Sequence, residues 1–145
     1  MGASIAARDQ GRRTILFIGD GSLQLTLQEL ATMLRLDLKP IIVVLSNDGY
    51  EIERKIHGET AKYNDISHID HQLLLQALSP PEGSKQKRVE HQSLQVKTKA
   101  ELDRVLNDKD FASASKLTLL EVVMPRNDSP HGLLLQAEMS AKINA

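Results

Sequence analysis

The fold is decided by residues 14–47, which read TILFIGDGSLQLTLQELATMLRLDLKPIIVVLSN. Residues 14–18 form a short, continuous apolar run ended by a glycine, which is typical of a strand buried on both faces in a parallel sheet. Apolar side chains then recur at spacings of three and four over residues 22–36, which predicts an amphipathic helix with Ser22 as its N-cap. Residues 41–45 form a second buried strand. The stretch therefore predicts one strand–helix–strand unit.

The rest of the chain continues this alternation. The expected helices cover 51–56, 71–78, 100–108 and 130–145, and the expected strands cover 94–96 and 117–124, with an exposed loop at 79–88. Alternating strands and helices predict a single α/β domain over 1–145, built on an open, mostly parallel, doubly wound sheet with helices on both faces. Residues 4–7 resemble a helix whose beginning is missing, so we expect the N-terminal edge of the domain to be incomplete.

Composition narrows the classes of function. Hydrophobic residues make up 41% of the 145 residues, which suits one folded domain and not a disordered chain. The 18 basic and 19 acidic residues nearly cancel, so no net field favours nucleic acid or an anionic membrane, and we expect neither as a partner. No apolar run approaches the ~20 residues that span a bilayer. The sequence has no cysteine, which excludes disulfides and thiolate metal sites and is compatible with a cytoplasmic location.

Residues 19–22, Gly19-Asp20-Gly21-Ser22, follow the first expected strand at its carboxyl end, where α/β sheets bind ligands. The two glycines let the backbone turn tightly and approach a ligand, and the following helix offers free N–H groups to a phosphate. Asp20 would face the same place, and a carboxylate beside a phosphate is repulsive unless a cation lies between them. Mg²⁺ meets this need because it binds carboxylates and phosphates together. The simpler interpretation is a tight turn in which Asp20 caps the helix.

A second polar segment, Asn47-Asp48-Gly49, follows the next expected strand. If the two strands are neighbours, their carboxyl ends meet at one edge of the sheet. The Asn47 side chain and a backbone carbonyl of this loop would then bind the same metal ion as Asp20, and Gly49 would leave room for that carbonyl. Taken alone, the tripeptide is an ordinary turn sequence.

Together the two segments resemble the signature of thiamine diphosphate enzymes, in which Gly-Asp-Gly is followed at a set interval by Asn, and which here covers residues 19–47. Residues 52–58, IERKIHG, are similar to the decarboxylase branch of that family. A looser resemblance to fungal pyruvate decarboxylase-like 2-oxo acid decarboxylases continues through AKYNDI (61–66), IDH (69–71) and TLLEVVMP (118–125). The resemblance implies the C-terminal, diphosphate-binding domain, with thiamine diphosphate and Mg²⁺ as cofactors and non-oxidative decarboxylation of a 2-oxo acid to an aldehyde and CO₂ as the reaction.

The resemblance also implies roles for individual residues. Asp20, Asn47 and the Gly49 carbonyl would bind Mg²⁺, while Gly21 and Ser22 would contact the diphosphate. Glu53 matches the active-centre glutamate, and an apolar pocket would disfavour its charged form and so suit it to proton transfer. The alternative for Glu53 is a solvated helix residue. The expected cofactor contacts are Gly19, Asp20, Gly21, Ser22, Asn47, Gly49, Tyr50 and Ile52.

Three positions depart from the fungal pattern. Glu51 stands where a small hydroxyl residue is usual, Glu59 where proline is usual, and Ile69 where tryptophan is usual. A second carboxylate at Glu51 would perturb the protonation of Glu53 or the substrate pocket. These departures leave the identity of the 2-oxo acid open.

A complete enzyme of this family also has an aminopyrimidine-binding domain, for which this sequence has no counterpart. We therefore expect the chain to be inactive alone and to act on a 2-oxo acid only beside the aminopyrimidine-binding domain of another chain or homologous subunit. We also expect an exposed apolar patch where that domain docks. Three alternatives stay open: a non-catalytic fragment or pseudoenzyme that binds or modulates a full-length decarboxylase, another thiamine diphosphate enzyme such as an indolepyruvate decarboxylase, and an unrelated α/β phosphate binder.

Overall fold

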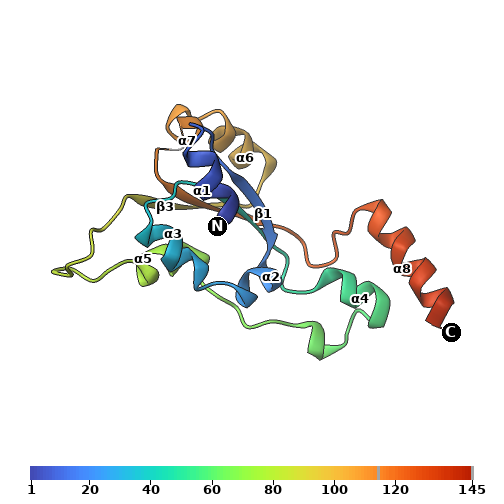
Figure 1. Cartoon of the computed structure of the whole chain (residues 1–145). Helices are drawn as coiled ribbons and strands as arrows, with labels where there is room; N and C mark the ends of the chain where they lie inside the picture. The colour runs from blue at the N-terminus through green and yellow to red at the C-terminus, as the bar shows by residue number, and fades with distance from the viewer. Residues whose placement is uncertain (114, 145) are drawn as a thin grey trace.

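The computed structural model describes residues 1–113 and 115–144, in which strands and helices alternate as expected (Figure 1). Ala145, the last residue of the helix expected over 130–145, lies outside the described residues. The elements are, in order, α1 (Gly2–Arg8), β1 (Ile15–Gly19), α2 (Asp20–Leu25), α3 (Glu29–Arg35), β2 (Ile41–Ser46), α4 (Glu51–His57), the 3-10 turn η1 (Lys62–Asn64), α5 (His71–Leu78), β3 (His91–Val96), α6 (Lys99–Leu106), α7 (Lys109–Ser113), β4 (Leu117–Val123) and α8 (His131–Asn144).

Within the described residues, the sheet has four strands in the order β1-β2-β4-β3, and every neighbouring pair is parallel. β1 and β2 run side by side, with Ile18 opposite Val44 and Gly19 opposite Leu45. The two strands that precede the polar motifs are thus neighbours, and their carboxyl ends lie at the same edge. The parallel sheet confirms the predicted α/β class.

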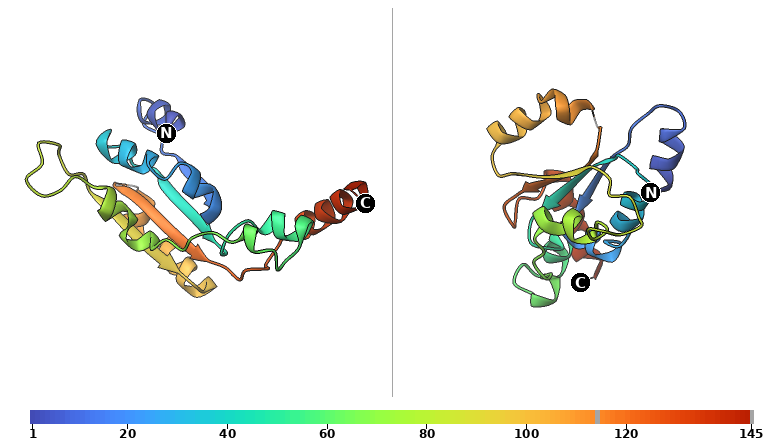
Figure 2. Two further views of the ribbon diagram at one scale, coloured as in Figure 1. Left: turned by 90° about the horizontal axis from the view of Figure 1, so that it is seen from below. Right: turned by 90° about the vertical axis from the view of Figure 1, so that its left-hand side faces the viewer.

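Helices cover both faces of the sheet, as the end-on view in Figure 2 shows. Successive side chains of a strand point to opposite faces, and in β2 they enter two separate apolar clusters. Ile42 and Val44 pack with α2, α3 and α5, whereas Ile41 and Val43 pack with α7 and with partly buried side chains of α6. Each such side chain contributes about 1.5–3 kcal/mol when buried, so β2 is anchored from both sides and fixes the loop that follows it.

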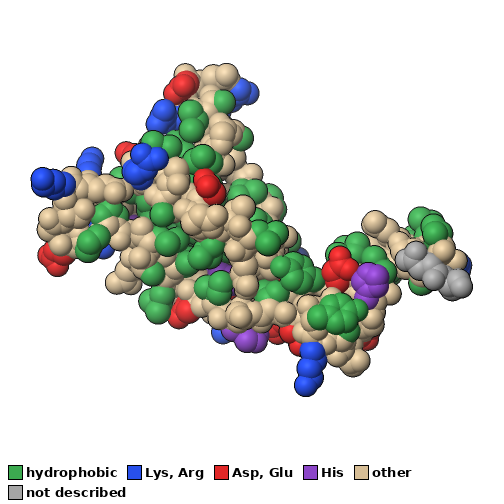
Figure 3. Space-filling view, turned by 60° about the horizontal axis from the view of Figure 1, so that its bottom comes forward, with side chains coloured by type: hydrophobic (Ala, Val, Ile, Leu, Met, Phe, Trp, Pro, Cys, Tyr) green, Lys and Arg blue, Asp and Glu red, His purple; other side chains and the backbone are tan. Residues whose placement is uncertain are grey.

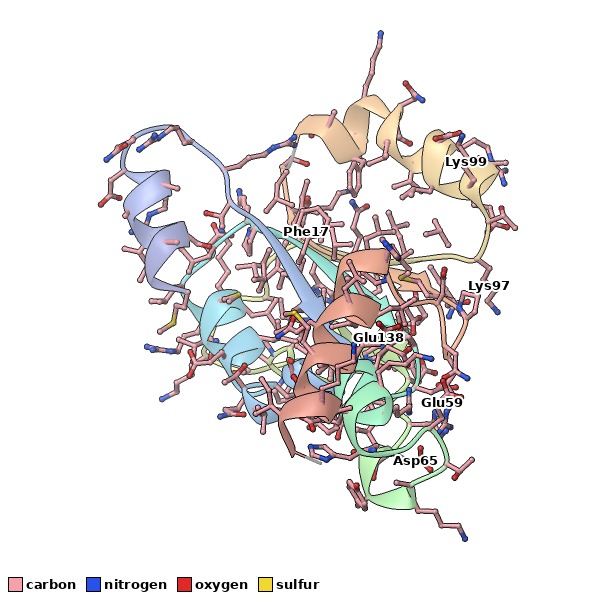
Figure 4. All side chains as sticks on the ribbon, turned by 90° about the vertical axis from the view of Figure 1, so that its right-hand side faces the viewer. Phe17, Glu59, Asp65, Lys97, Lys99 and Glu138 are labelled. Atoms are coloured by element: carbon pink, nitrogen blue, oxygen red, sulfur yellow. The ribbon has the colours of Figure 1, made fainter. Side chains whose placement is uncertain are left out.

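β1 is less buried than the sequence suggests. The prediction that this strand is buried on both faces is wrong, because β1 is an edge strand and its first three residues are exposed. Phe17, labelled in Figure 4, has 67% of its surface exposed. It pairs in register with Val43 and so lies on the face covered by α6 and α7, beyond the part that those helices cover. Phe17 therefore contributes exposed apolar surface of the kind expected where a second domain docks. That such a domain docks here stays a prediction.

The helix expected over residues 22–36 is divided in two. α2 begins at Asp20 with Gly19 as its N-cap residue, so the prediction that Ser22 is the N-cap is wrong. Thr26 has non-helical backbone angles, and α3 starts afresh at Glu29. Asp20 thus lies in the first turn of α2, where its carboxylate accepts hydrogen bonds from the loop after β2.

Two further boundaries differ from expectation, one because of strand pairing and one because of a local capping motif. β3 begins at His91 and not at residue 94, because it pairs with β4 from His91 opposite Leu117 onward. The helix expected over 100–108 is α6, which begins at Lys99 behind a capping box formed by Thr98 and Glu101. It ends at Leu106, and α7 follows separately.

α4 and α8 pack against each other and form a lobe that stands away from the sheet (Figures 1 and 3). The loop between α5 and β3, exposed over residues 81–88, extends at the other end of the molecule (Figure 2). Among the helices described, none combines the length and the apolar character needed to cross a bilayer.

A buried hydrogen-bonded pair, His71 and Glu121, ties α5 to β4. His71 Nδ1 lies 2.8 Å from Glu121 Oε1, and both side chains are buried. Gln72 and Gln95 donate hydrogen bonds to the other carboxylate oxygen at 3.1 and 2.7 Å. Burial alone raises the pKa of the Glu121 carboxyl, but the hydrogen bonds from His71, Gln95 and Gln72 outweigh it and hold the pKa below its ordinary value of 4.5.

This pair predicts an acid-dependent loss of stability. A carboxyl with a lowered folded-state pKa stabilises the fold above its unfolded pKa, and this stabilisation is lost as the pH falls through the folded pKa. We expect the free energy of unfolding of Glu121→Gln to be lower than that of the wild type above the unfolded pKa of the carboxyl and to approach it as the pH falls through the lowered pKa of the folded state. Urea unfolding at successive pH values measures the difference, with the exposed Glu138→Gln as control. A difference that stays constant down to pH ~3 would contradict this account.

Candidate functional site

Asp20 lies where β1 ends and α2 begins, and only 3% of its surface is exposed. Oδ1 accepts a hydrogen bond from the Gly21 N–H at 2.8 Å. Oδ2 accepts from the Asn47 N–H at 3.1 Å and from the Gly49 N–H at 3.2 Å. A buried carboxylate needs such partners, because burying an unpaired charge is costly. Asp20 is therefore held by backbone groups from two neighbouring strand ends and does not act as a simple helix cap.

The loop after β2 has a backbone conformation that its sequence favours. Asp48 has φ 62° and Gly49 has φ 119°, both in the left-handed region. Asn, Asp and Gly tolerate this region better than other residues. At Gly49 a Cβ would lie 2.6 Å from the Asn64 carbonyl oxygen and 2.8 Å from Arg54 Nη2. The glycine is required by the packing of the loop itself, whereas the sequence suggested only room for the metal-binding carbonyl.

The other two glycines of the site differ in what surrounds them. At Gly21 a Cβ would lie 2.6 Å from the Tyr50 ring, whose hydroxyl donates a hydrogen bond to the Gly21 carbonyl at 3.3 Å. At Gly19 a Cβ would meet no described atom within 4 Å. Gly21 thus makes room for Tyr50, and Gly19 faces open space at the strand end.

These segments line one cavity of about 250 Å³, and all eight residues expected to contact the cofactor are among its lining residues. Its lining residues are Gly19, Asp20, Gly21, Ser22, Leu45, Asn47, Gly49, Tyr50, Glu51, Ile52 and Leu133. Leu133 comes from α8, so the α4–α8 lobe forms one wall. A larger hollow of about 390 Å³ lies at the amino ends of β1 and β2, beside Thr14 and Pro40, and contains none of the expected contacts. Size alone therefore does not identify the site.

Glu53 is outside this cavity. Its side chain is 47% exposed and forms an ion pair with His57, whose Nε2 lies 3.3 Å from Glu53 Oε2. The apolar surroundings expected for Glu53 are thus not found among the described residues, because it lies on the outer side of α4 while Arg54 turns inward. Its catalytic role stays a prediction.

Glu51 is the carboxylate of α4 that lines the cavity, and it is 8% exposed. It accepts a hydrogen bond from the Ser129 hydroxyl and lies 3.7 Å from both Arg54 Nη1 and Lys55 Nζ. The sequence did not predict that Arg54 is buried or that it contacts this loop. A run of charges on one helix gives no local signal of which side chain turns inward.

The oxygen atoms at this edge suit Mg²⁺. A carboxylate offers about four lone-pair sites, and three hydrogen bonds to Asp20 leave one on Oδ1 for a metal ion. Amide and carbonyl oxygens of Asn47 and Gly49 are the hard, neutral ligands that complete such a shell beside phosphate. No group of three or more acidic, His or Cys side chains capable of holding a metal occurs among the described residues. The donor set therefore fits a magnesium ion that shares its shell with a phosphate ligand.

Comparison with known proteins decides the family. The family model described as "Thiamine pyrophosphate enzyme, C-terminal TPP binding domain" matches residues 1–122. The chain belongs to this family. Thiamine pyrophosphate, or TPP, is another name for thiamine diphosphate, so the resemblance carried by residues 19–47 is confirmed and an unrelated phosphate binder is excluded.

Curated proteins that resemble this TPP-binding domain include pyruvate decarboxylases of several fungi. A pyruvate decarboxylase of Candida glabrata is 49% identical over 147 residues, covering 100% of this chain and 25% of the relative. A pyruvate decarboxylase of Aspergillus fumigatus is 48% identical over 144 residues, covering 99% and 24%. Pyruvate decarboxylase isozyme 1 of Saccharomyces cerevisiae is 46% identical over 147 residues, covering 100% and 25%. The chain spans about a quarter of the length of the curated relatives it matches.

Gly49 and Gly58 have similar φ angles, so replacing each in turn separates backbone strain from steric collision. Gly58 has φ 113°, and a Cβ there would meet nothing within 4 Å. We expect Gly58→Ala to lower the free energy of unfolding by about 1–3 kcal/mol, the range for backbone strain. Gly49→Ala should lower it by about 1–3 kcal/mol more, because its Cβ collides with Asn64 and Arg54. Urea unfolding measures both, and equal losses would show that the loop yields to the added methyl group.

Proposed function

We propose that this domain binds thiamine diphosphate through Mg²⁺ at the carboxyl edge of β1 and β2. The observation that carries the proposal is the buried Asp20 carboxylate, which joins the two motif loops in one cavity. Asp20, Asn47 and the Gly49 carbonyl would hold the metal ion. Gly21 and Ser22 would contact the diphosphate, and Gly19, Tyr50 and Ile52 would line the rest of the site.

We further propose that the domain serves a pyruvate decarboxylase-like enzyme, which converts a 2-oxo acid to an aldehyde and CO₂. Support comes from the pyruvate decarboxylases of several fungi, which match over the whole chain. Thiamine diphosphate, when bound, supplies a carbon centre that stabilises the carbanion left by CO₂. Glu53 would donate or accept a proton at its carboxyl group during this reaction.

This activity needs groups from outside the described site. Glu53 is half-exposed and paired with His57, so burial against a second protein surface would be needed to suit it to proton transfer. We propose that an aminopyrimidine-binding domain of another chain or homologous subunit supplies that surface, and that the isolated chain is inactive. We also propose a cytoplasmic location, which the cysteine-free sequence accommodates.

A second candidate function is binding without catalysis. The Glu51 carboxylate lines the cavity where the fungal pattern has a small hydroxyl residue, and this departure at the site is what supports a chain that binds or modulates a full-length decarboxylase without turning over substrate. The two functions differ in whether a complemented complex releases CO₂.

Binding is tested by removing the metal-binding charge. We expect isothermal titration calorimetry to give a binding heat for thiamine diphosphate only in the presence of Mg²⁺, and Asp20→Asn to abolish it, because an amide replaces the anionic metal ligand. Asp103→Asn, a change of the same kind on exposed α6, should bind like the wild type. Binding by Asp20→Asn at the wild-type affinity would contradict the metal site.

Catalysis is tested by complementation. We expect the chain, mixed with an aminopyrimidine-binding domain, Mg²⁺, thiamine diphosphate and pyruvate, to release CO₂, and Glu53→Gln to lower the rate by about 10²–10⁴-fold, the usual contribution of a general acid–base group. A coupled assay for the aldehyde gives the rate. Stable complexes that release no CO₂ would support the binding function instead.

A further inference from the structure

Arg54 is fully buried in α4, with 0% of its surface exposed. A buried charge must be paired and hydrogen-bonded to be tolerated. The partners of its guanidinium therefore show what this side chain does for the fold. Those partners lie in the loop between β2 and α4.

The shortest contacts of Arg54 are with backbone carbonyls and not with acids. Nη1 donates a hydrogen bond to the Asn47 carbonyl at 3.2 Å, and Nη2 donates to the Asp48 carbonyl. The carboxylates of Glu51 and Asp65 lie at 3.7 and 3.5 Å, beyond direct hydrogen bonds. Figure 4 labels Asp65 beside the segment that holds η1. The acids therefore balance the charge, while the carbonyls fix the direction of the guanidinium.

The same loop is held from its other side by Asp20. The N–H groups of Asn47 and Gly49 point to the Asp20 carboxylate, while the carbonyls of Asn47 and Asp48 point to Arg54. The Asp20 carboxylate thus accepts hydrogen bonds from N–H groups of the loop, and the Arg54 guanidinium donates hydrogen bonds to its carbonyls. The carbonyls of Asn47 and Asp48 are thus bonded to Arg54, and the next carbonyl along the chain is that of Gly49, the proposed metal ligand. Arg54 Nη2 also occupies the space that a side chain on Gly49 would need.

We propose that Arg54 is a positioning residue for the metal-binding loop, and that Glu51 and Asp65 are its counter-ions. The part of this proposal that concerns metal affinity rests on the proposed function. It also gives Glu51 a role, since its carboxylate neutralises Arg54 and is held by Ser129, and it lies on a different side of α4 from Glu53. The two-pronged guanidinium suits two successive carbonyls, whereas a lysine ammonium is a single compact charge.

The first test needs no ligand. Amide hydrogen exchange is measured on the chain for wild type, Arg54→Met, Arg54→Lys and Lys55→Met, with the Val44 amide in β2 as an internal reference for global unfolding. We expect the Asn47 and Gly49 amides to exchange at least about tenfold faster in Arg54→Met, since their bonds to Asp20 depend on loop order. Arg54→Lys should show a smaller increase. Lys55→Met should show none, because Lys55 lies near Glu51 but does not contact the loop.

The second test measures affinity for Mg²⁺ and thiamine diphosphate by calorimetry. Loss of a residue that orients metal ligands typically weakens binding by roughly 10–100-fold, and we expect this for Arg54→Met, with partial recovery in Arg54→Lys. Glu51→Gln combined with Arg54→Met removes the buried acid that loses its Arg54 counter-ion, so it should restore thermal stability toward the wild type but not affinity or loop protection. This combination keeps the test open if Arg54→Met does not fold.

The outcomes separate the two proposals. If the Asn47 and Gly49 amides of Arg54→Met accelerate only as much as Val44, Arg54 serves stability alone and the positioning role is wrong. If Glu51→Gln with Arg54→Met recovers both stability and affinity, the role is also wrong. If the wild type binds no thiamine diphosphate, the proposed function fails, and the exchange rates still decide the role of Arg54.

Discussion

The site depends on one buried carboxylate that receives three backbone N–H groups. Asp20 accepts from Gly21 in its own helix and from Asn47 and Gly49 across the sheet edge. Hydrogen bonds to a charged group contribute about 1.5–3 kcal/mol each, and an unpaired buried charge costs at least as much. The charge of Asp20 and the position of the loop are therefore interdependent. Moving the loop would leave the carboxylate with only one of its three N–H partners, and removing the charge would weaken the hold on the loop.

The fold makes this interaction possible by fixing where two strands end. β1 and β2 are parallel neighbours, and β2 is held by apolar clusters on both faces. The loop after β2 consequently starts from a rigid point, although β1 is an exposed edge strand. Arg54 then holds the carbonyls of the same loop from α4. Positive and negative groups on opposite sides thus keep two consecutive left-handed residues, Asp48 and Gly49, in place.

The sequence predicts features that follow from the order of strands and helices along the chain. It does not predict which distant side chains surround a given residue. Strand, helix, strand predicted that Asp20 and Asn47 would meet, because parallel neighbours end at one edge. The apolar run at 14–18 predicted a strand but not its place at the edge of the sheet. The glycines lie at the site as expected, but their neighbours were not predicted: Gly21 makes room for Tyr50, and Gly49 makes room for Asn64 and Arg54. Only the fold shows that His71 pairs with Glu121, because the two residues lie 50 positions apart in the chain.

The charge count of the proposed site explains why metal and diphosphate would bind together. Of the three proposed ligands only Asp20 is charged, since Asn47 and Gly49 offer neutral oxygens, so Mg²⁺ would keep a net positive charge after binding to the protein. Arg54 adds no net positive charge to the site, because Glu51 and Asp65 lie beside it, and these two acids also pair with Lys55 and Arg126. Phosphate oxygens would supply the missing negative charge, in keeping with the preference of Mg²⁺ for sites shared with phosphate ligands. With one charged metal ligand, the proposed site would therefore bind the metal–diphosphate pair more tightly than the metal ion alone.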